Sequence, residues 1–328
     1  MIIHKKSYAK INLSLKILRK LPSGYHELYT VMQRISLCDN IKVEITEGDS
    51  GIKINCTNPS LADSDNIAYK AADLFLRTVN TPTLIGVNID IEKNIPLQAG
   101  LGGGSSNAAA VLLALNEYLS RGGVIPPADT SYFHGRQNAA PTNDTGTQLR
   151  NLWLSEHKLM ELAAKIGADV PFFVSNLSCA ICEGIGEKIT PHNHDLSGCV
   201  LIVKPIYGIS TRQAFEDWDN AALCRGELCS PVENNQCGRY IAGEQSSPLQ
   251  LQDRYNFKND FSALAFNQNA NLREICDIML HYGANQAELT GSGSALFGIF
   301  TNFAKAQECE ANLRRHNDVQ FCGIFDFV

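Results

Sequence analysis

Apolar and polar side chains alternate along residues 7–18. In an extended strand, a period of two places them on opposite faces. One face would carry Ile11, Leu13, Leu15 and Ile17, and the other would carry Lys10, Asn12, Ser14 and Lys16. Such a polar face is most simply explained by exposure to solvent, but the spacing also sets Lys10 beside Asn12.

The first half of the chain continues as strands and helices. A turn at residues 21–24 precedes extended segments at 25–37, 40–45 and 52–56, which predict an antiparallel meander. The further elements predicted are a helix over 66–77 capped by Asp65, a strand over 85–91, a helix to about residue 118 and a helix over 155–166.

The second half begins near residue 194 and mixes strands with helices. Its predicted elements are a strand over 200–205, a helix over 210–215, a helix over 271–282, strands over 286–289 and 295–300, a helix over 303–315 and a strand over 319–325. We therefore expect an α+β fold with domains at 1–193 and 194–328. Residues 120–151 and 218–256 lack periodicity and are predicted to be irregular surface insertions.

Composition excludes several classes of protein. The chain has 328 residues, 44% of them apolar and 19% charged, and a net charge of −6, so no global basic field would draw it to nucleic acid. No apolar run is long enough to span a membrane, and residues 1–6 do not resemble a signal peptide. We expect a soluble protein.

The eleven cysteines are scattered and odd in number, which does not indicate a disulfide framework. Cys179 and Cys182 have the spacing of a metal or redox motif, and His192 and His194 follow. In a strand, however, residues three apart point to opposite faces and cannot share a metal. Buried or incidental thiols in a reducing, cytoplasmic setting are the simpler interpretation.

A glycine-rich stretch at residues 96–109 carries the clearest chemical signal. Four of its residues between 100 and 104 are glycines, and an alanine-rich helix follows, which Ser105 or Ser106 could cap. Backbone N–H groups in such a loop and the helix dipole both favour a negative charge. The alternative is a flexible turn, but the preceding strand, the three consecutive glycines and the paired serines favour phosphate binding.

Two common phosphate loops do not fit this stretch. No lysine follows the glycines, as a Walker A loop requires, and the spacing G-x-G-x-x-G with an acidic residue about 20 positions later is absent. A third kind of nucleotide phosphate cradle remains.

Asp169 lies at a bend between the helix that ends before Gly167 and an apolar segment that contains Pro171. It could cap the next turn or act as a catalytic base, and the residues alone leave both alternatives open. The segment Gly291-Ser292-Gly293 could likewise be no more than a hairpin turn.

Several segments together resemble a known kinase family. Residues 96–109 and 289–298 are similar to the glycine motifs of the galactokinase, homoserine kinase, mevalonate kinase and phosphomevalonate kinase superfamily. Residues 8–13, 24–28 and 167–172 resemble, within it, the 4-diphosphocytidyl-2-C-methyl-D-erythritol kinases of the non-mevalonate isoprenoid pathway. The similarity covers most of residues 5–119, 155–216 and 259–325, and the two insertions depart from the usual length.

The resemblance implies a two-domain kinase with its active site in the cleft between the domains. It implies Asp169 as the base that takes the proton of the substrate's 2-hydroxyl, with Lys10 stabilising the transferring phosphoryl group. ATP would be bound by Pro96, Leu97, Gln98, Ala99, Gly100, Leu101, Gly102, Gly103, Gly104, Ser105 and Ser106, and Asn66 matches a position at the family's adenine pocket. Mg²⁺ would be bound mainly through the nucleotide, with no dedicated protein site.

The resemblance also implies how the cytidylated substrate is held. Asn12 would hold the methylerythritol, Tyr25 would stack on cytosine, and His26 would hydrogen-bond to it. Further substrate contacts are implied for Thr211, Phe215, Gly291, Ser292 and Gly293, with Phe215 on the other face of the stacked base.

Two other functions fit parts of the pattern. A sister kinase for homoserine or mevalonate would share the loop but lack the Tyr25-His26 pair, and a non-catalytic nucleotide or sugar sensor would have lost Lys10 or Asp169. No nucleic-acid or membrane partner is expected, and the protein is predicted to be a monomer or a weak dimer.

Overall fold

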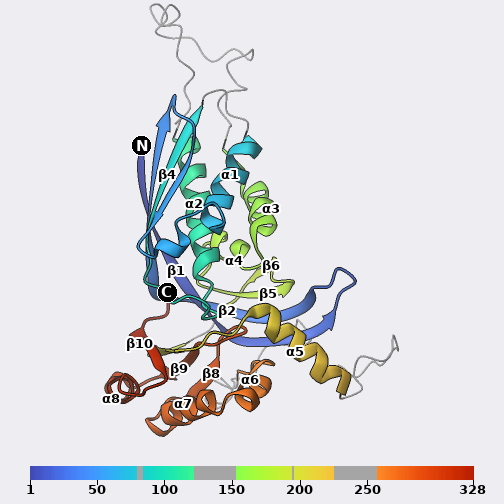
Figure 1. Cartoon of the computed structure of the whole chain (residues 1–328), viewed down its shortest axis with the longest axis vertical. Coiled ribbons are helices and arrows are strands. Elements are labelled where there is room, and N and C mark those ends of the chain that lie inside the picture. Colours follow the sequence, from blue (N-terminus) through green and yellow to red (C-terminus); the bar gives the residue numbers. More distant parts are fainter. Residues whose placement is uncertain (80–83, 122–152, 194–195, 225–256) are drawn as a thin grey trace, which may run out of the picture.

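The chain folds around two β-sheets that pack against each other (Figure 1). The computed structural model describes residues 1–79, 84–121, 153–193, 196–224 and 257–328. The first sheet contains β1 (Ile2–Lys20), β2 (His26–Glu47), β3 (Gly51–Cys56), β4 (Ile85–Glu92), β5 (Cys179–Gly184) and β6 (Lys188–Pro191). The second contains β7 (Cys199–Pro205), β8 (Gln286–Leu289), β9 (Leu296–Phe300) and β10 (Val319–Phe325).

The strand order of the first sheet is β3-β4-β2-β5-β6, with β1 paired to β2. β2 is one strand of 22 residues, where the sequence predicted two. Residues 40–47 of β2 pair with β4 and residues 28–33 pair with β5, both antiparallel. Three register shifts in the β1–β2 ladder let this long hairpin bend across both sheets.

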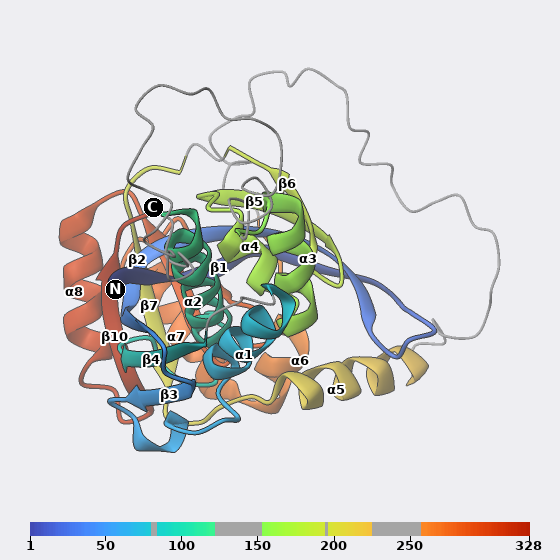
Figure 2. The same cartoon turned by 90° about the horizontal axis from the view of Figure 1, so that it is seen from above.

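Helices cover the outer face of each sheet (Figures 1 and 2). Those beside the first sheet are α1 (Ile67–Val79), α2 (Gly103–Ser120), α3 (Glu156–Ile166) and α4 (Val170–Val174), with the short η1 (Pro59–Leu61) before them. Those beside the second are α6 (Ser262–Gln268), α7 (Ala270–His281) and α8 (Phe303–Leu313), and α5 (Thr211–Cys224) lies beside the β1–β2 hairpin (Figure 1). The second sheet is antiparallel, in the order β10-β7-β9-β8.

The apolar face predicted for residues 7–18 is buried, and part of it lies between the sheets. Ile11 and Leu13 pack there with Val200, Phe297 and Ile299 of the second sheet. Two other apolar clusters fill the space between each sheet and its helices. The α+β class expected from the sequence is confirmed.

Three local predictions were wrong. Asn66, not Asp65, caps α1, because its Oδ1 accepts a hydrogen bond from the N–H of Ala68 at 2.9 Å. No side chain caps α2, because this helix begins at Gly103 and both serines lie inside its first turns. The helix predicted to reach residue 215 is α5, which continues to Cys224, so residues 218–224 are helical.

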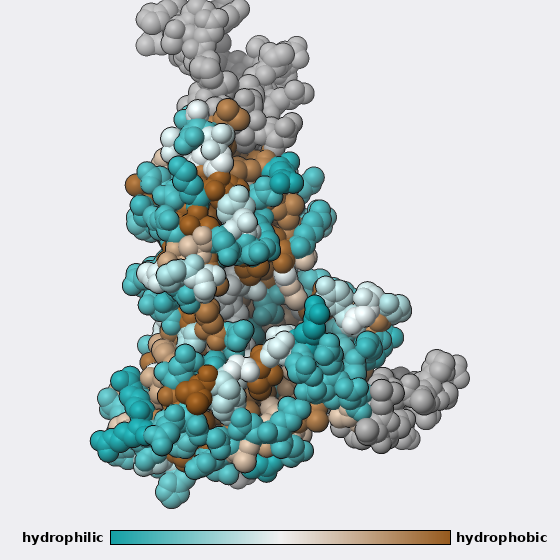
Figure 3. Space-filling model, in the orientation of Figure 1, coloured by the Kyte–Doolittle hydropathy of each residue, from teal (hydrophilic) through white to brown (hydrophobic). Residues whose placement is uncertain are grey.

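The insertions predicted at 120–151 and 218–256 otherwise lie almost entirely outside the described residues. Over the described part, no helix is long and apolar enough to cross a membrane. On the face shown in Figure 3, hydrophilic side chains predominate, with apolar ones interspersed.

Candidate active site

The glycine-rich loop is fixed between β1 and the turn that joins β8 to β9. The N–H of Lys10 donates to the carbonyl of Leu101 at 3.0 Å, and the N–H of Ala295 donates to the carbonyl of Ala99 at 3.3 Å. Gly100 and Gly102 have left-handed backbones, with φ of 71° and 68°. A Cβ on Gly102 would lie 3.0 Å from the Phe173 ring, so glycine satisfies both the conformation and the close packing here.

α2 begins directly after this loop. The first N–H groups of an α-helix have no partner inside the helix, so the first turn from Gly103 directs its donors toward the cleft end of the loop. The sequence predicted this arrangement of a glycine loop before a helix N-terminus, and such an arrangement can bind an anion. Ser105 lines the cleft, whereas Ser106 is buried against Ser7, with 2.7 Å between their Oγ atoms.

Lys10 lies at the inner end of the same cleft and is buried, unlike a lysine on a solvated strand face. Its Nζ donates to Asn12 Oδ1 at 2.5 Å and to the Gly100 carbonyl at 2.8 Å. Asp169 Oδ2 lies 3.6 Å from the same Nζ, and the Asp169 side chain keeps 29% of its surface exposed. β1 therefore presents one cation to both the glycine loop and the Asp169 carboxylate.

Asp169 occupies the N-cap position of α4, but its side chain makes no capping hydrogen bond. Of the two alternatives open for this residue, simple helix capping is excluded. Its carboxylate faces the cleft beside Lys10.

Asn12 is held by partners from two other segments and by Lys10 of its own strand. Its Nδ2 donates to Thr30 Oγ1 at 2.7 Å, its N–H donates to Thr290 Oγ1 at 3.0 Å, and its Oδ1 accepts from Lys10. Thr30 in turn donates to the carbonyl of Ser14 at 2.6 Å. This network fixes the Asn12 side chain and, through it, the Lys10 ammonium.

The outer end of the cleft is formed by the tip of the β1–β2 hairpin and by α5. The His26 ring stacks on Phe215 with centroids 4.6 Å apart and 17° between the planes. His26 Nε2 lies 2.7 Å from Asp219 Oδ1, and Lys20 Nζ donates to Asp219 Oδ2 at 2.5 Å. Tyr25 is 63% exposed.

These parts line one cleft of about 890 Å³ between the sheets and their loops. It brings together Lys10, Asn12, Tyr25, His26, Pro96, Leu97, Gln98, Ala99, Gly100, Leu101, Gly102, Gly103, Gly104, Ser105, Asp169, Thr211, Phe215, Gly291 and Ser292. Three residues singled out from the sequence, Asn66, Ser106 and Gly293, do not line it. Asn66 uses both side-chain groups locally, on Ala68 N–H and the Leu61 carbonyl.

The sequence alone did not identify several polar residues that line this cleft or hold its side chains in place. Thr30 and Thr290 hold Asn12 from strand and turn, and Asp219 pairs with His26 from a helix placed in the predicted insertion. Asn259 is buried and donates to the carbonyls of Leu289 and Gly291 at 2.9 and 2.8 Å. In the sequence, each of these residues is only a polar residue, and its position does not show which residue it contacts.

The cysteine pair predicted to be inert is placed as expected. Cys179 belongs to the apolar cluster between the sheets and Cys182 to the cluster under the helices, so they point to opposite faces of β5. Burial raises the pKa of these thiols to about 11 and about 12. His194 lies outside the described residues. Within the described ranges, no group of three or more His, Cys, Asp or Glu side chains is placed to hold a metal ion.

Comparison with known proteins agrees with this architecture. The family model "GHMP kinases N terminal domain" matches residues 66–129, and "GHMP kinases C terminal" matches residues 249–319. The fold and the glycine loop thus define the class of GHMP kinases. At 13% identity and a TM-score of 0.62, a homoserine kinase from Cytophaga hutchinsonii shares the fold, with 99% of this chain and 95% of that chain covered.

More similar proteins specify the family. The 4-diphosphocytidyl-2-C-methyl-D-erythritol kinase of Clostridium novyi (strain NT) is 34% identical over 320 residues, which cover 96% of this chain and 97% of that protein. The one from Clostridium tetani is 35% identical, with the same coverage. A crystal structure of 4-(cytidine 5'-diphospho)-2C-methyl-D-erythritol kinase matches at 27% identity and a TM-score of 0.64, over 98% of this chain and 99% of that chain. The chain belongs to the family of 4-diphosphocytidyl-2-C-methyl-D-erythritol kinases.

Proposed function

We propose that this protein transfers the γ-phosphoryl group of ATP to the 2-hydroxyl of 4-diphosphocytidyl-2-C-methyl-D-erythritol, a step of the non-mevalonate route to isoprenoid precursors. The observation that carries the proposal is the Lys10–Asp169 pair, 3.6 Å apart, at the end of a glycine loop and in the same cleft as Tyr25 and His26.

In the proposed reaction, the Asp169 carboxylate takes the proton of the 2-hydroxyl, and the hydroxyl oxygen bonds to the γ-phosphorus. The bond from that phosphorus to the β–γ bridging oxygen breaks, and ADP leaves with the electron pair. Lys10 orients the hydroxyl and stabilises charge on the transferring group, which is the main demand that phosphoryl transfer makes on a protein.

The loop amides at the start of α2 bind the phosphates of ATP in this proposal. Mg²⁺ would be held mainly by the nucleotide, where it would neutralise phosphate charge. Ser105 and Asp169 line the cleft near the loop, and their side-chain oxygens are the kind of atom that Mg²⁺ binds.

The cytidine end would bind between the hairpin tip and α5. Tyr25 is exposed and can stack on the base, and His26, whose Nε2 pairs with Asp219, can offer Nδ1 to its polar edge. Because His26 already covers one face of Phe215, that ring can offer the base only its other face. Asn12, Thr211, Gly291 and Ser292 are placed along the path toward Lys10 and would contact the methylerythritol part.

We further propose that the protein works in the cytoplasm as a monomer or weak dimer. The eight cysteines whose side chains the structure describes are free thiols, which a reducing compartment favours.

ADP release is the direct test of the proposed reaction. Purified protein is given ATP, Mg²⁺ and one of three alcohols: the cytidylated methylerythritol, methylerythritol phosphate or mevalonate. We expect turnover with the first alone, and turnover reduced by ~10²–10⁴-fold in the Asp169→Asn variant. Equal or faster turnover with mevalonate would contradict the substrate assignment, and the absence of turnover with all three would contradict catalysis.

A further inference from the structure

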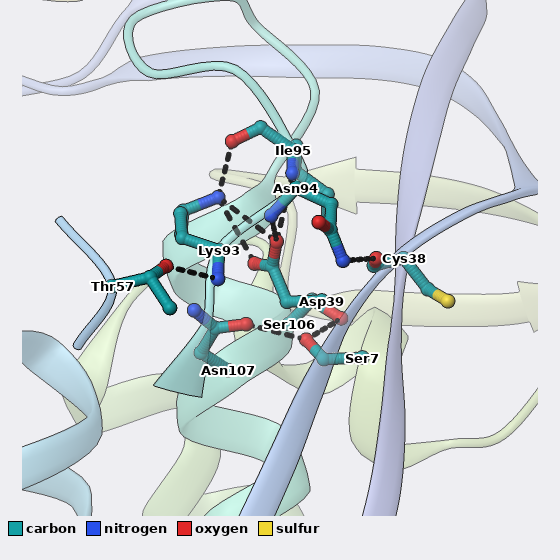
Figure 4. Close-up of polar contacts among 9 residues, drawn as sticks. All are labelled: Ser7, Cys38, Asp39, Thr57, Lys93, Asn94, Ile95, Ser106 and Asn107. Atoms are coloured by element: carbon teal, nitrogen blue, oxygen red, sulfur yellow. Dashed lines mark hydrogen bonds and ion pairs between the residues drawn. The ribbon is translucent and has the colours of Figure 1, made fainter. Parts of the chain in front are cut away.

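The segment that leads into the glycine loop is held by side chains and not by a strand partner. The β2–β4 ladder ends at the pair Asn40–Glu92. Beyond it, the N–H of Lys93 donates to Thr57 Oγ1 at 2.9 Å, and the next two N–H groups, of Asn94 and Ile95, both donate to Asp39 Oδ1 (Figure 4). Three successive backbone donors are thus fixed immediately before Pro96.

Asp39 is fully buried and accepts from the two amides at 2.7 and 2.8 Å. Lys93 Nζ donates to the same Oδ1 at 3.2 Å and lies 3.0 Å from Oδ2, where the contact is an ion pair without hydrogen-bond geometry. Burying a carboxylate is costly unless it is both paired and hydrogen-bonded, as it is here. A buried carboxylate that accepts hydrogen bonds from backbone amides restricts that backbone to one conformation.

Lys93 is committed to this arrangement. Its ammonium donates to the Ile95 carbonyl as well as to Asp39, so it ties together the segment 93–95 (Figure 4). Burial lowers the pKa of Lys93, and the Asp39 charge opposes that change.

The same pair lies against the first residue of α2. A Cβ on Gly103 would lie 3.2 Å from Lys93 Nζ and 3.0 Å from Ile95 Cγ2, so the segment 93–95 packs directly beneath the phosphate-binding turn. On the far side of that turn, Ser7 Oγ lies 2.7 Å from Ser106 Oγ and 2.6 Å from Asn107 Oδ1 (Figure 4). The loop is therefore anchored before its start by Asp39 and after its end by Ser7.

We propose that Asp39 is a positioning residue for nucleotide binding: its carboxylate holds the amides of Asn94 and Ile95, and thereby sets the phosphate-binding loop, without touching ATP. The inference rests on the proposed function, in which this loop binds the triphosphate. Asp39 lies in β2 and does not line the cleft. In this proposal it nevertheless affects the affinity for the nucleotide.

Two double variants separate the acceptor role of Asp39 from its charge and its volume. Asp39→Leu with Lys93→Met removes the acceptor oxygens but leaves no unpaired buried charge. Asp39→Asn with Lys93→Met restores an acceptor oxygen in a side chain of similar size. Asp90→Asn, on the partly exposed face of β4, removes a carboxylate of the same sheet and is the matched control.

The readouts are the KM for ATP, the KM for the alcohol, and the Kd of a non-hydrolysable ATP analogue measured by equilibrium binding. We expect the Leu/Met variant to raise the KM and Kd for the nucleotide about tenfold, with the alcohol KM within about twofold, because a displaced binding group loses affinity steeply. The Asn/Met variant should recover nucleotide affinity to within about threefold of wild type, and the Asp90→Asn control should match wild type.

Unchanged nucleotide affinity in the Leu/Met variant, equal rises in both KM values, or no recovery with Asn would overturn the proposal. Should the Leu/Met variant fail to fold by circular dichroism, Asp39→Ala with Lys93→Met replaces it, because alanine also removes the acceptor oxygens, and a rise confined to the nucleotide is again required. Turnover of the wild type in the same assay shows whether the proposed function itself holds.

Discussion

A Cβ placed on Gly100 would lie 2.2 Å from the carbonyl oxygen of Thr290. This is far inside van der Waals contact, and the obstacle is backbone, which cannot rotate away. The glycine loop of the first half and the β8–β9 turn of the second half therefore meet at a point where only a glycine fits.

Gly100→Ala should reduce stability and nucleotide affinity together. The left-handed φ of 71° costs an alanine about 1–2 kcal/mol, and the contact with Thr290 adds to that cost. Gly48→Ala is the control, because Gly48 has a φ of 78° with nothing within 4 Å of its Cβ position. Thermal unfolding of both variants measures the difference, and equal losses of stability would mean that the Thr290 contact has no effect.

Asp169→Asn should lower kcat by ~10²–10⁴-fold, the usual contribution of a positioned base. Nucleotide affinity should change little, because no hydrogen bond joins the side chain to α4 or to the loop. Single-turnover kinetics with saturating ATP measures the chemical step. Near-normal turnover would show that Asp169 is not the base.

Tyr25→Ala should raise the KM for the cytidylated alcohol through the loss of roughly 1–3 kcal/mol of stacking, the range found for bases on aromatic side chains. Tyr25→Phe keeps the ring and should stay close to wild type. Initial rates over both substrate concentrations distinguish the two sites. An effect on the KM for ATP alone would place Tyr25 outside the cytidine pocket.

Glu288 gives stability a pH dependence. Burial raises the pKa of this carboxyl, although hydrogen bonds from Ser262 and the Leu289 N–H act in the opposite sense. A carboxyl with a raised folded-state pKa contributes most below its unfolded pKa of about 4.5, and that stability is lost as pH rises through the folded value. Above that window the folded state carries the cost of the buried charge.

Glu288→Gln should therefore flatten the pH dependence of the unfolding free energy and favour the variant at neutral pH. Denaturant unfolding between pH 4 and pH 8 measures it, with Asp277→Asn as an exposed control on α7. A parallel pH profile in the variant would show that Glu288 does not carry this effect.

Period and spacing in the sequence were sufficient for the parts of the site that lie within one element. The alternation in β1 placed Lys10 beside Asn12, and the glycine run placed the loop before α2. The same alternation could not show that this polar face is buried, because the burial of Asn12 depends on Thr30 and Thr290 from other elements.

Contacts between distant segments were beyond the reach of pattern alone. Nothing in the periodicity places Asp169 next to Lys10, and only the resemblance to known kinases joined them. Asp39 and Asp219 are short acidic residues in unremarkable contexts, whose roles come from amides and rings brought to them by the fold. The boundary of α5 was missed because Asp217, Asp219 and Asn220 interrupt the apolar pattern just before the irregular run that follows the helix.

The apolar layer that β1 and β2 share with the second sheet affects how far the two sheets can move relative to each other. It is continuous from Ala9 to Ile299, and the C-terminal segment extends it, with the N–H of Val328 donating to the carbonyl of Arg34 at 3.1 Å. An interface of this kind resists relative movement of its two sides. We therefore expect the two sheets to move little relative to each other, so that substrates and products would pass the cleft by rearrangement of the side chains and loops at its rim.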